Sequence, residues 1–400
     1  MTKRLIPLIL AILLIIPTIT HAQDGISLID STAEVYFPSA LVFKIKAQSQ
    51  NDITKIRLHY QVNKMNYAQV TSEAWPDFAP STKVETEWIW DMRKANLLTG
   101  TEVRYWWTIE DKTGDRLTTP PEVVHFDDLR YSWRKLTVGQ LSLFWYKGNQ
   151  AFADELMASC QQALERLAQN TGVHPEQPIS LFIYASTKDL QGAMIFPQEW
   201  TGGVAFTEYG LIAIGVPTSE LDWGKRAVAH ELGHMVIHQI TFSPYGDILP
   251  TWLDEGLAMY AEGKPDLYLQ SVLEKAIAQQ KLISVRSLSS PFSAEPQEAY
   301  ISYAESQSLV EFLIKNYGKD NMLRLLGLFK AGNTCDEALT EVYGFDQDGL
   351  DTLWQKYITS QTQFQPGFQY VSPEETSPAT FLWEESPGKL VTANVLLGVL

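Results

Sequence analysis

Cysteine and basic residues are both scarce in this chain. Of its 400 residues only two are cysteines, Cys160 and Cys335, and 31 lysines and arginines stand against 47 aspartates and glutamates. The cysteines allow at most one disulfide, and whether they pair or remain free thiols is open. The formal charge of −16 argues against nucleic acid as a partner, because phosphate binding needs basic patches.

Apolar runs long enough to span a bilayer are also missing, but a shorter run marks the beginning of the chain. Lys3 and Arg4 precede the apolar run Leu5–Ile16, and Thr20-His21-Ala22 is a small-residue cleavage site. Residues 1–22 are therefore predicted to be a secretory signal peptide. An uncleaved membrane anchor is the alternative, although the run is short for it.

The opposite end has a different composition. Residues 361–400 combine a proline-rich linker with an apolar tail, Leu390–Leu400, which is too short to span a bilayer. The tail ends as a truncated membrane anchor would. We therefore expect an exported protein, extracellular or at the cell surface, whose C-terminus could provide a membrane tether.

Residues 23–127 alternate apolar and polar side chains with period two. Runs such as Val42–Lys46, Ile56–Tyr60 and Val103–Ile109 are separated by turn signals. This pattern predicts an antiparallel β-sandwich of the immunoglobulin or fibronectin type III kind. It carries no specific functional signal.

Helical spacing and short strands replace this pattern from residue 128 onward. Residues 128–262 are predicted to hold a small sheet and several helices, and residues 263–360 to be a helical subdomain. Strands are expected at 179–184, 202–206 and 211–215, and helices at 151–170, from 221, and at 267–282, 298–317, 320–330, 335–343 and 346–359.

The pattern that best indicates chemistry is His230-Glu231-Leu232-Gly233-His234, which lies in an apolar stretch. On an α-helix residues i and i+4 share a face, so His230 and His234 can direct imidazole nitrogens at one metal ion. Glu231 is displaced sideways and can reach a water on the metal as a general base. Buried imidazole and carboxyl groups need partners, and a metal ion supplies them.

A catalytic zinc site usually has three protein ligands, so a third must come from elsewhere. Ile237 and Ile240 occupy the positions at which a metzincin needs a glycine and a third histidine, which argues against that class. His238 is one turn further on, but three consecutive turns of a straight helix cannot converge on one ion. Glu255 is the best candidate.

Glu255 lies in Trp252-Leu253-Asp254-Glu255-Gly256-Leu257-Ala258, twenty residues after the first motif. This stretch resembles the second helix of gluzincins, which carries Trp-x-x-Glu-Gly-x-Ala or a close variant. The resemblance to peptidase MA-like gluzincins, such as aminopeptidase N-like enzymes and thermolysin, covers roughly residues 130–360. It implies an α+β zincin-like fold, a Zn²⁺ cofactor held by His230, His234 and Glu255, and Glu231 as the general base.

Two further stretches resemble parts of aminopeptidase N-like enzymes. Ile301–Ser306 resembles a helix opened by a tyrosine that hydrogen-bonds the tetrahedral intermediate, which implies Tyr303 as a catalytic residue; a packed aromatic is the alternative. Gly203, Val204, Ala205 and Phe206 are the nearest match to Gly-x-Met-Glu-Asn on the edge strand that binds substrate.

In those enzymes the glutamate of the edge strand binds the substrate's free α-amine, whereas Phe206 stands at that position here. A buried ammonium without a carboxylate is costly, so we expect an endopeptidase. Phe206 could instead line a subsite or pack under the sheet. Glu208 is the only nearby carboxylate that could replace the missing one.

These features together predict an exported zinc metallopeptidase that hydrolyses peptide bonds in peptide or protein substrates. The alternative is a cell-surface binding module whose zincin-like region is a scaffold with little turnover. The intact Glu231 argues against it, because a scaffold does not need a carboxylate beside a zinc-bound water. Hydrolysis of a non-peptide amide stays open.

Overall fold

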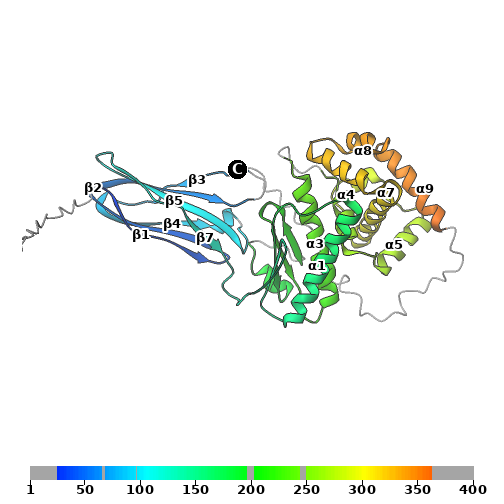
Figure 1. Cartoon of the computed structure of the whole chain (residues 1–400), viewed down its shortest axis with the longest axis horizontal. Helices are drawn as coiled ribbons and strands as arrows, with labels where there is room; N and C mark the ends of the chain where they lie inside the picture. Colours follow the sequence, from blue (N-terminus) through cyan, green and yellow to red (C-terminus); the bar gives the residue numbers. More distant parts are fainter. Residues whose placement is uncertain (1–24, 65–67, 96, 196–201, 244–248, 363–400) are drawn as a thin grey trace, which may run out of the picture.

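The chain is divided into an elongated group of strands and a rounder, helix-rich part (Figure 1). We call residues 25–127 the strand module and residues 128–362 the α+β region. The computed structural model describes residues 25–64, 68–95, 97–195, 202–243 and 249–362. The predicted signal peptide, the proline-rich linker after residue 362 and the apolar tail lie outside the described residues.

The strand module confirms the predicted antiparallel β structure. Its strands form one antiparallel network with the path β1-β2-β5-β6, in which β3 and β4 also pair with β2, and β7 pairs with β5. The strands are β1 Ser27–Tyr36, β2 Ala40–Val62, β3 Ser72–Ala74, β4 Ser81–Asp91, β5 Thr101–Asp111, β6 Arg116–Thr118 and β7 Glu122–Phe126, with a 3₁₀ turn, η1, at Met92–Lys94.

The long strand β2 organises this module because its two halves have different neighbours. Residues 40–48 pair with β1 and β4, whereas the half from Ile53 onward pairs with β5 and, near its end, with β3. Alternate side chains of both halves, among them Phe43, Ile45 and Leu58, are buried in one hydrophobic cluster that also contains Trp107 of β5. The period-two pattern in the sequence reflects this one-sided burial.

The α+β region follows in the order strand, helix and helical subdomain. Its elements are β8 Arg134–Val138, β9 Leu141–Trp145, α1 Gln150–Thr171, β10 Ile179–Tyr184, α2 Thr187–Gln191, β11 Gly203–Phe206, the 3₁₀ turn η2 Thr207–Tyr209, β12 Leu211–Gly215, α3 Leu221–Thr241, α4 Thr251–Glu262, α5 Leu267–Ala278, α6 Val285–Leu288, α7 Pro296–Lys330, α8 Cys335–Tyr343 and α9 Gln347–Thr362.

The sheet of this region has the strand order β11-β12-β10-β9-β8. Strands β9, β10 and β12 are parallel, and β11 is an antiparallel edge strand paired only with β12 among the described strands. Leu181 and Ile183 of β10 face the cluster that includes α1 and α3, whereas Phe182 and Tyr184 face a second cluster with residues of the strand module. Both faces of the sheet are therefore covered.

The elements expected in this region are present. Strands β8 and β9 and the short helices α2 and α6 were not predicted. The predicted stop at Gly318 is confirmed: Gly318 has φ 79° and interrupts the helical backbone, so α7 consists of two helices that meet at a kink there. Both cysteines are free, with Cys160 buried in the core and Cys335 partly buried.

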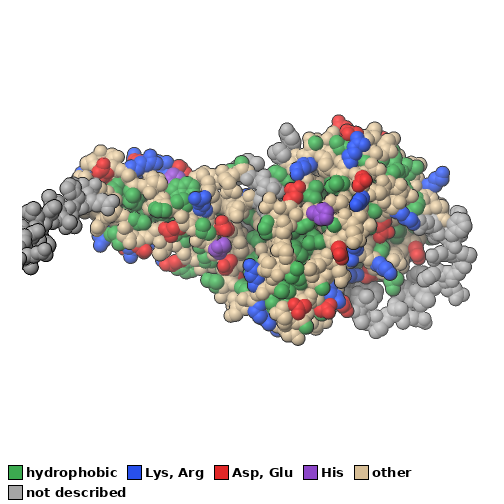
Figure 2. Space-filling model, in the orientation of Figure 1, with side chains coloured by type: hydrophobic (Ala, Val, Ile, Leu, Met, Phe, Trp, Pro, Cys, Tyr) green, Lys and Arg blue, Asp and Glu red, His purple; other side chains and the backbone are tan. Residues whose placement is uncertain are grey.

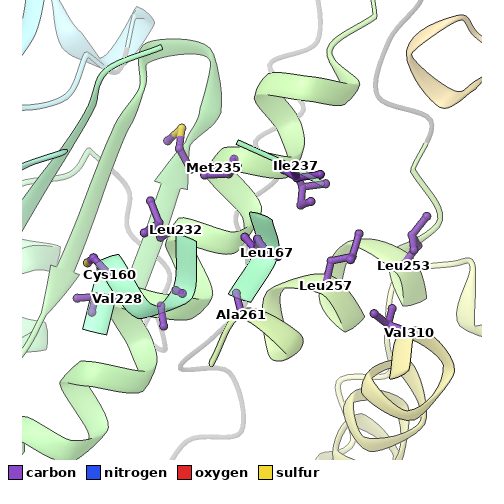
Figure 3. Close-up of a cluster of buried hydrophobic side chains, with 14 of the residues drawn as sticks. Cys160, Leu167, Val228, Leu232, Met235, Ile237, Leu253, Leu257, Ala261 and Val310 are labelled. Atoms are coloured by element: carbon purple, nitrogen blue, oxygen red, sulfur yellow. The ribbon is translucent and has the colours of Figure 1, made fainter. Parts of the chain in front are cut away.

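Close helix crossings hold the core of this region together. Side chains of α1, α3, α4 and α7 interdigitate there, including Leu167, Leu232, Leu257 and Val310 (Figure 3). A Cβ on Gly233 would lie 2.9 Å from Cα of Ala258, and one on Gly256 would lie 2.4 Å from the Ser306 carbonyl oxygen. Only glycine allows α4 to approach both α3 and α7 so closely.

The surface shows no marked charge asymmetry on the face drawn in Figure 2, where acidic and basic side chains are interspersed. No helix in the described part of the chain is long and apolar enough to cross a membrane.

A fully buried carboxyl group, Glu305 of α7, supports the segment before α6. The backbone N–H of Ile283 donates to both Glu305 oxygens, at 3.1 and 3.2 Å. Burial raises the pKa of Glu305 to about 8, against a small lowering by this hydrogen bond and a further increase caused by Asp351. The group is therefore protonated in the folded protein at neutral pH and ionised in the unfolded chain.

Glu305 should make the folded state lose stability as pH rises. Because its folded pKa exceeds the unfolded value, its contribution is complete below about pH 4.5 and is lost as pH rises through about 8, by up to about 1.4 kcal/mol per pH unit. Denaturant unfolding at pH 5 to 8 should show wild type losing stability relative to Glu305→Gln. Glu298→Gln, an exposed change on the same helix, is the control; parallel curves for wild type and Glu305→Gln would refute the assignment.

Candidate metal centre

Three side chains from two helices converge on one buried point. His230 and His234 come from successive turns of α3, and Glu255 comes from α4. The two Nε2 atoms lie 3.1 Å apart, and they are 3.4 and 3.5 Å from Oε2 of Glu255. All three residues are at most 4% exposed. The predicted trio is thus brought together by the crossing of α3 and α4, and its atoms form a group that could hold a metal ion.

The other ring nitrogens of the histidines show which way the donor atoms point. Nδ1 of His230 lies 2.8 Å from Oε1 of Glu262, and Nδ1 of His234 lies 2.9 Å from Oδ1 of Asp254. An ionised carboxylate only accepts hydrogen bonds, so each Nδ1 carries the proton. A neutral imidazole then presents a lone pair at Nε2, and two lone pairs and a carboxylate oxygen face one another.

This donor set fits a metal ion. Three acceptors that face one another repel unless a cation lies between them. Four-coordinate zinc has bonds of about 2.0–2.2 Å to imidazole and carboxylate ligands, which places neighbouring ligand atoms about 3.3 Å apart. The observed separations of 3.1 to 3.5 Å agree with that value.

The pKa shifts of His230 and Glu255 reflect the same attraction of this cluster for positive charge. Burial alone would lower the pKa of His230, but hydrogen bonds with Glu255 and Glu262 raise it to about 9. Burial likewise opposes the charged form of Glu255, yet the nearby histidines hold its pKa below the usual range. The cluster therefore attracts positive charge, whether a proton or a metal ion.

Glu231 occupies the neighbouring position on α3 and is fully buried. Neither of its carboxylate oxygens has a hydrogen-bond partner within the described residues. Burial raises the pKa of Glu231, while the charges of His230 and His234 oppose the increase. A buried carboxyl group without a partner is costly to the fold.

Gly203 of the edge strand lies directly over Glu231. A Cβ on Gly203 would approach Oε1 of Glu231 to 3.0 Å. Gly215 N donates to the Gly202 carbonyl oxygen at 2.9 Å, so alternation along β11 pairs Val204 and Phe206 with β12. The backbone groups of Gly203 and Ala205 consequently point to the open edge.

The four residues of the predicted substrate strand divide between the two faces of the sheet. The Ala205 side chain packs against the cluster that contains α3, on the same face as Glu231. Phe206 packs against the opposite cluster, with Phe182, Leu211 and the strand module. Of the two roles considered for Phe206, this arrangement favours packing under the sheet.

Tyr303 of α7 lies within the electrostatic reach of the site. Burial raises its pKa well above the ordinary value, and the negative charges of Glu255 and Glu231 raise it further. Its ring packs edge-on against Phe292, with centroids 5.2 Å apart. The hydroxyl therefore stays protonated and can donate a hydrogen bond.

His238 takes no part in the trio. Its Nε2 lies 3.3 Å from the Asp254 carboxylate of the neighbouring helix α4. Asp254 and Glu262 were missed as site residues in the sequence. Asp254 directly precedes Glu255, and Glu262 is seven residues further on α4, so two helical turns return it to the same face.

Two histidines one turn apart on a helix, with a glutamate from the following helix, define the metallopeptidase class of metal site. Residues 159–360, slightly more than half of the chain, match the Peptidase MA superfamily. The chain belongs to this superfamily, and it is accordingly a hydrolase of the metallopeptidase type. No curated protein sequence matches the chain.

Solved structures similar to this chain include two aminopeptidases. Legionella pneumophila aminopeptidase A in complex with aspartic acid is 11% identical, with 79% of this chain and 47% of that chain covered and a TM-score of 0.35. An aminopeptidase N family protein from Idiomarina loihiensis is 10% identical, with 89% and 75% covered and a TM-score of 0.32. OgpA from Akkermansia muciniphila is 10% identical over 26% of this chain and 28% of that chain, with a TM-score of 0.21. This chain thus spans about half of the Legionella enzyme and less than a third of OgpA.

Glu262 should strengthen metal binding through His230. Glu262→Gln exchanges the carboxylate for a weaker, neutral acceptor and should weaken Zn²⁺ binding by about 10–100-fold. Competition of the metal-free protein with a chelating dye measures this change directly. Asp266→Asn, which alters a carboxylate bound to Arg226 just beyond α4, is the matched control and should leave affinity unchanged. Equal affinities for wild type and Glu262→Gln would remove Glu262 from the site.

Proposed function

We propose that this protein is an exported zinc-dependent endopeptidase. The observation that carries the proposal is the open edge of β11 beside the buried Glu231, directly next to the His230, His234 and Glu255 cluster. Membership of the Peptidase MA superfamily supports peptide bonds as the target.

His230, His234 and Glu255 would hold the zinc ion. Zinc bound there would supply Lewis-acid polarisation of a water molecule and of the substrate carbonyl. Glu231 would accept a proton from the attacking water and then deliver it to the leaving amine. The Tyr303 hydroxyl would donate a hydrogen bond to the developing oxyanion.

The partnerless carboxylate of Glu231 favours this enzyme over a binding scaffold. In a binding scaffold, the buried Glu231 carboxylate would lower the stability of the fold and would have no catalytic role. A general base, in contrast, must keep its oxygens available for the water proton.

Substrate recognition through β11 favours extended peptides of varied sequence. The outward backbone groups of Gly203 and Ala205 can add a peptide strand to the sheet, and such pairing does not read side chains. Phe206 provides no carboxylate for a free α-amine, and its side chain lies on the other face. These features support cleavage within chains rather than removal of terminal residues.

The remaining parts of the proposal concern the location and the strand module. The charged and apolar pattern of residues 1–22 supports export. The pairing of β2 with strands on both sides of one apolar cluster supports an immunoglobulin or fibronectin type III-like sandwich.

Replacing the general base should separate metal binding from catalysis. Purified protein should carry about one zinc per chain, and Glu231→Gln should keep the zinc while losing about 10²–10⁴-fold in hydrolysis. Tyr303→Phe should lower the rate of hydrolysis by about 10²-fold, and the Glu255→Ala protein should no longer bind the metal. Metal analysis and digestion of a peptide library measure these effects. Full zinc occupancy in Glu255→Ala, or near-normal activity in Glu231→Gln, would contradict the assigned roles.

An endopeptidase should not require a free N-terminus. One peptide cleaved in the library digest is compared in free and N-acetylated forms, and the two should be cut at the same internal bond with similar kcat/KM. Cleavage of only the free form, with release of single residues, would show an aminopeptidase.

A further inference from the structure

A lysine of the strand module reaches the end of the substrate edge. Lys64 follows β2, and its Nζ lies 2.7 Å from Oε2 of Glu208 in η2, 144 residues away along the chain. The same ammonium lies 5.3 Å from the ring centroid of Tyr209. Both side chains of the ion pair are partly exposed, at 36% and 26%. They are therefore accessible to a ligand at the surface.

The ion pair continues the line of β11. Gly203 lies over Glu231, β11 ends at Phe206, and η2 begins at the next residue. At about 3.3 Å per residue in a strand and about 2 Å in a 3₁₀ turn, Glu208 is at most about 14 Å from Gly203. This upper limit is the length of about four residues of extended peptide.

The strand module is held beside the sheet of the α+β region by packing and hydrogen bonds. A Cβ on Gly100 of the module would lie 2.7 Å from the Phe182 ring and 3.6 Å from Leu211. The buried Asp128 accepts hydrogen bonds from Arg130, at 2.7 and 2.8 Å, and from Tyr184 of β10, at 3.2 Å, while its N–H donates to Thr99 of the module at 3.0 Å. Lys64 therefore belongs to a module that packs against the sheet containing the edge strand β11.

We propose that Lys64 and Glu208 form a subsite of the peptide groove, in which Lys64 neutralises Glu208 and prevents selection of cationic groups. The inference rests on the proposed peptidase function. A peptide added antiparallel to β11 places its residues N-terminal to the scissile bond toward η2, and antiparallel pairing is the more stable arrangement. One of the first four or so residues before the scissile bond then meets the ion pair.

The ion pair also explains why Glu208 would not act as an anchor for a substrate amine. Glu208 is the only carboxylate close to the missing glutamate position, and its negative charge is already compensated by Lys64. An incoming lysine, arginine or α-ammonium would have to displace Lys64 without gaining net attraction. The strand module therefore sets the charge preference at this end of the groove.

Removal of the lysine should expose the acidic subsite. The test measures how tightly the zinc-loaded full chain binds fluorescent peptides. The chain carries Glu231→Gln, and the peptides are based on a sequence that the wild type cleaves. A lysine replaces glutamine at each position in turn on both sides of the scissile bond. With Lys64→Met, the peptide with lysine at one position, within about four residues before the scissile bond, should bind about fivefold more tightly than the glutamine peptide. Without Lys64→Met, no position should show this gain.

The controls separate the subsite from other effects. Adding Glu208→Gln to Lys64→Met should abolish the gain, Lys64→Arg should behave as the parent, and Lys44→Met, which breaks a different ion pair of the module, should cause no gain. If Lys64→Met does not fold, Lys64→Gln replaces it with the same expectation. No gain, a gain on the C-terminal side, or a gain that persists without Glu208 would overturn the inference. A wild type that cleaves no peptide would instead refute the proposed peptidase function.

Discussion

The structure depends on holding three electron-pair donors face to face in a buried place. Nε2 of His230, Nε2 of His234 and Oε2 of Glu255 repel one another in the absence of a cation, and their burial makes the repulsion stronger. The fold resists this repulsion through the close crossings at Gly233 and Gly256, which leave no room for α4 to move away. Carboxylates of α4 then fix the orientation of both imidazole rings. One short helix thus provides a donor atom and the groups that orient the other two.

The sequence was informative where a single helix determines geometry. Spacing of four residues placed His230 and His234 on one face, and the apolar surroundings correctly predicted burial. Glu255 followed from resemblance, because no local rule states which carboxylate a second helix will present. Glu262 was not predicted as a site residue because its partner, His230, lies on another helix. A glutamate two turns after Glu255 has the same sequence pattern as a solvated surface residue.

Elements that depend on tertiary contacts were harder to predict. β8 pairs with β9, and β9 pairs with β10, and this pairing stabilises the two strands more than their own propensity. The stop at Gly318, by contrast, was predicted correctly, because its φ of 79° interrupts the helical backbone inside α7. Whether Phe206 faced the groove or the sheet interior could not be decided without the register of β11, because a shift of one residue exchanges the two faces.

The junction between the two parts has a consequence for the order of assembly. The face of the sheet that carries Phe182, Tyr184 and Leu211 is apolar and is covered in part by Leu98 and Phe37 of the strand module. The module precedes the sheet in the chain, so during synthesis it can fold before β10 and β12 emerge, as N-terminal parts generally do. The newly made sheet then meets a finished apolar surface instead of water. In this sense the module provides a preformed apolar surface on which the peptidase region can be completed.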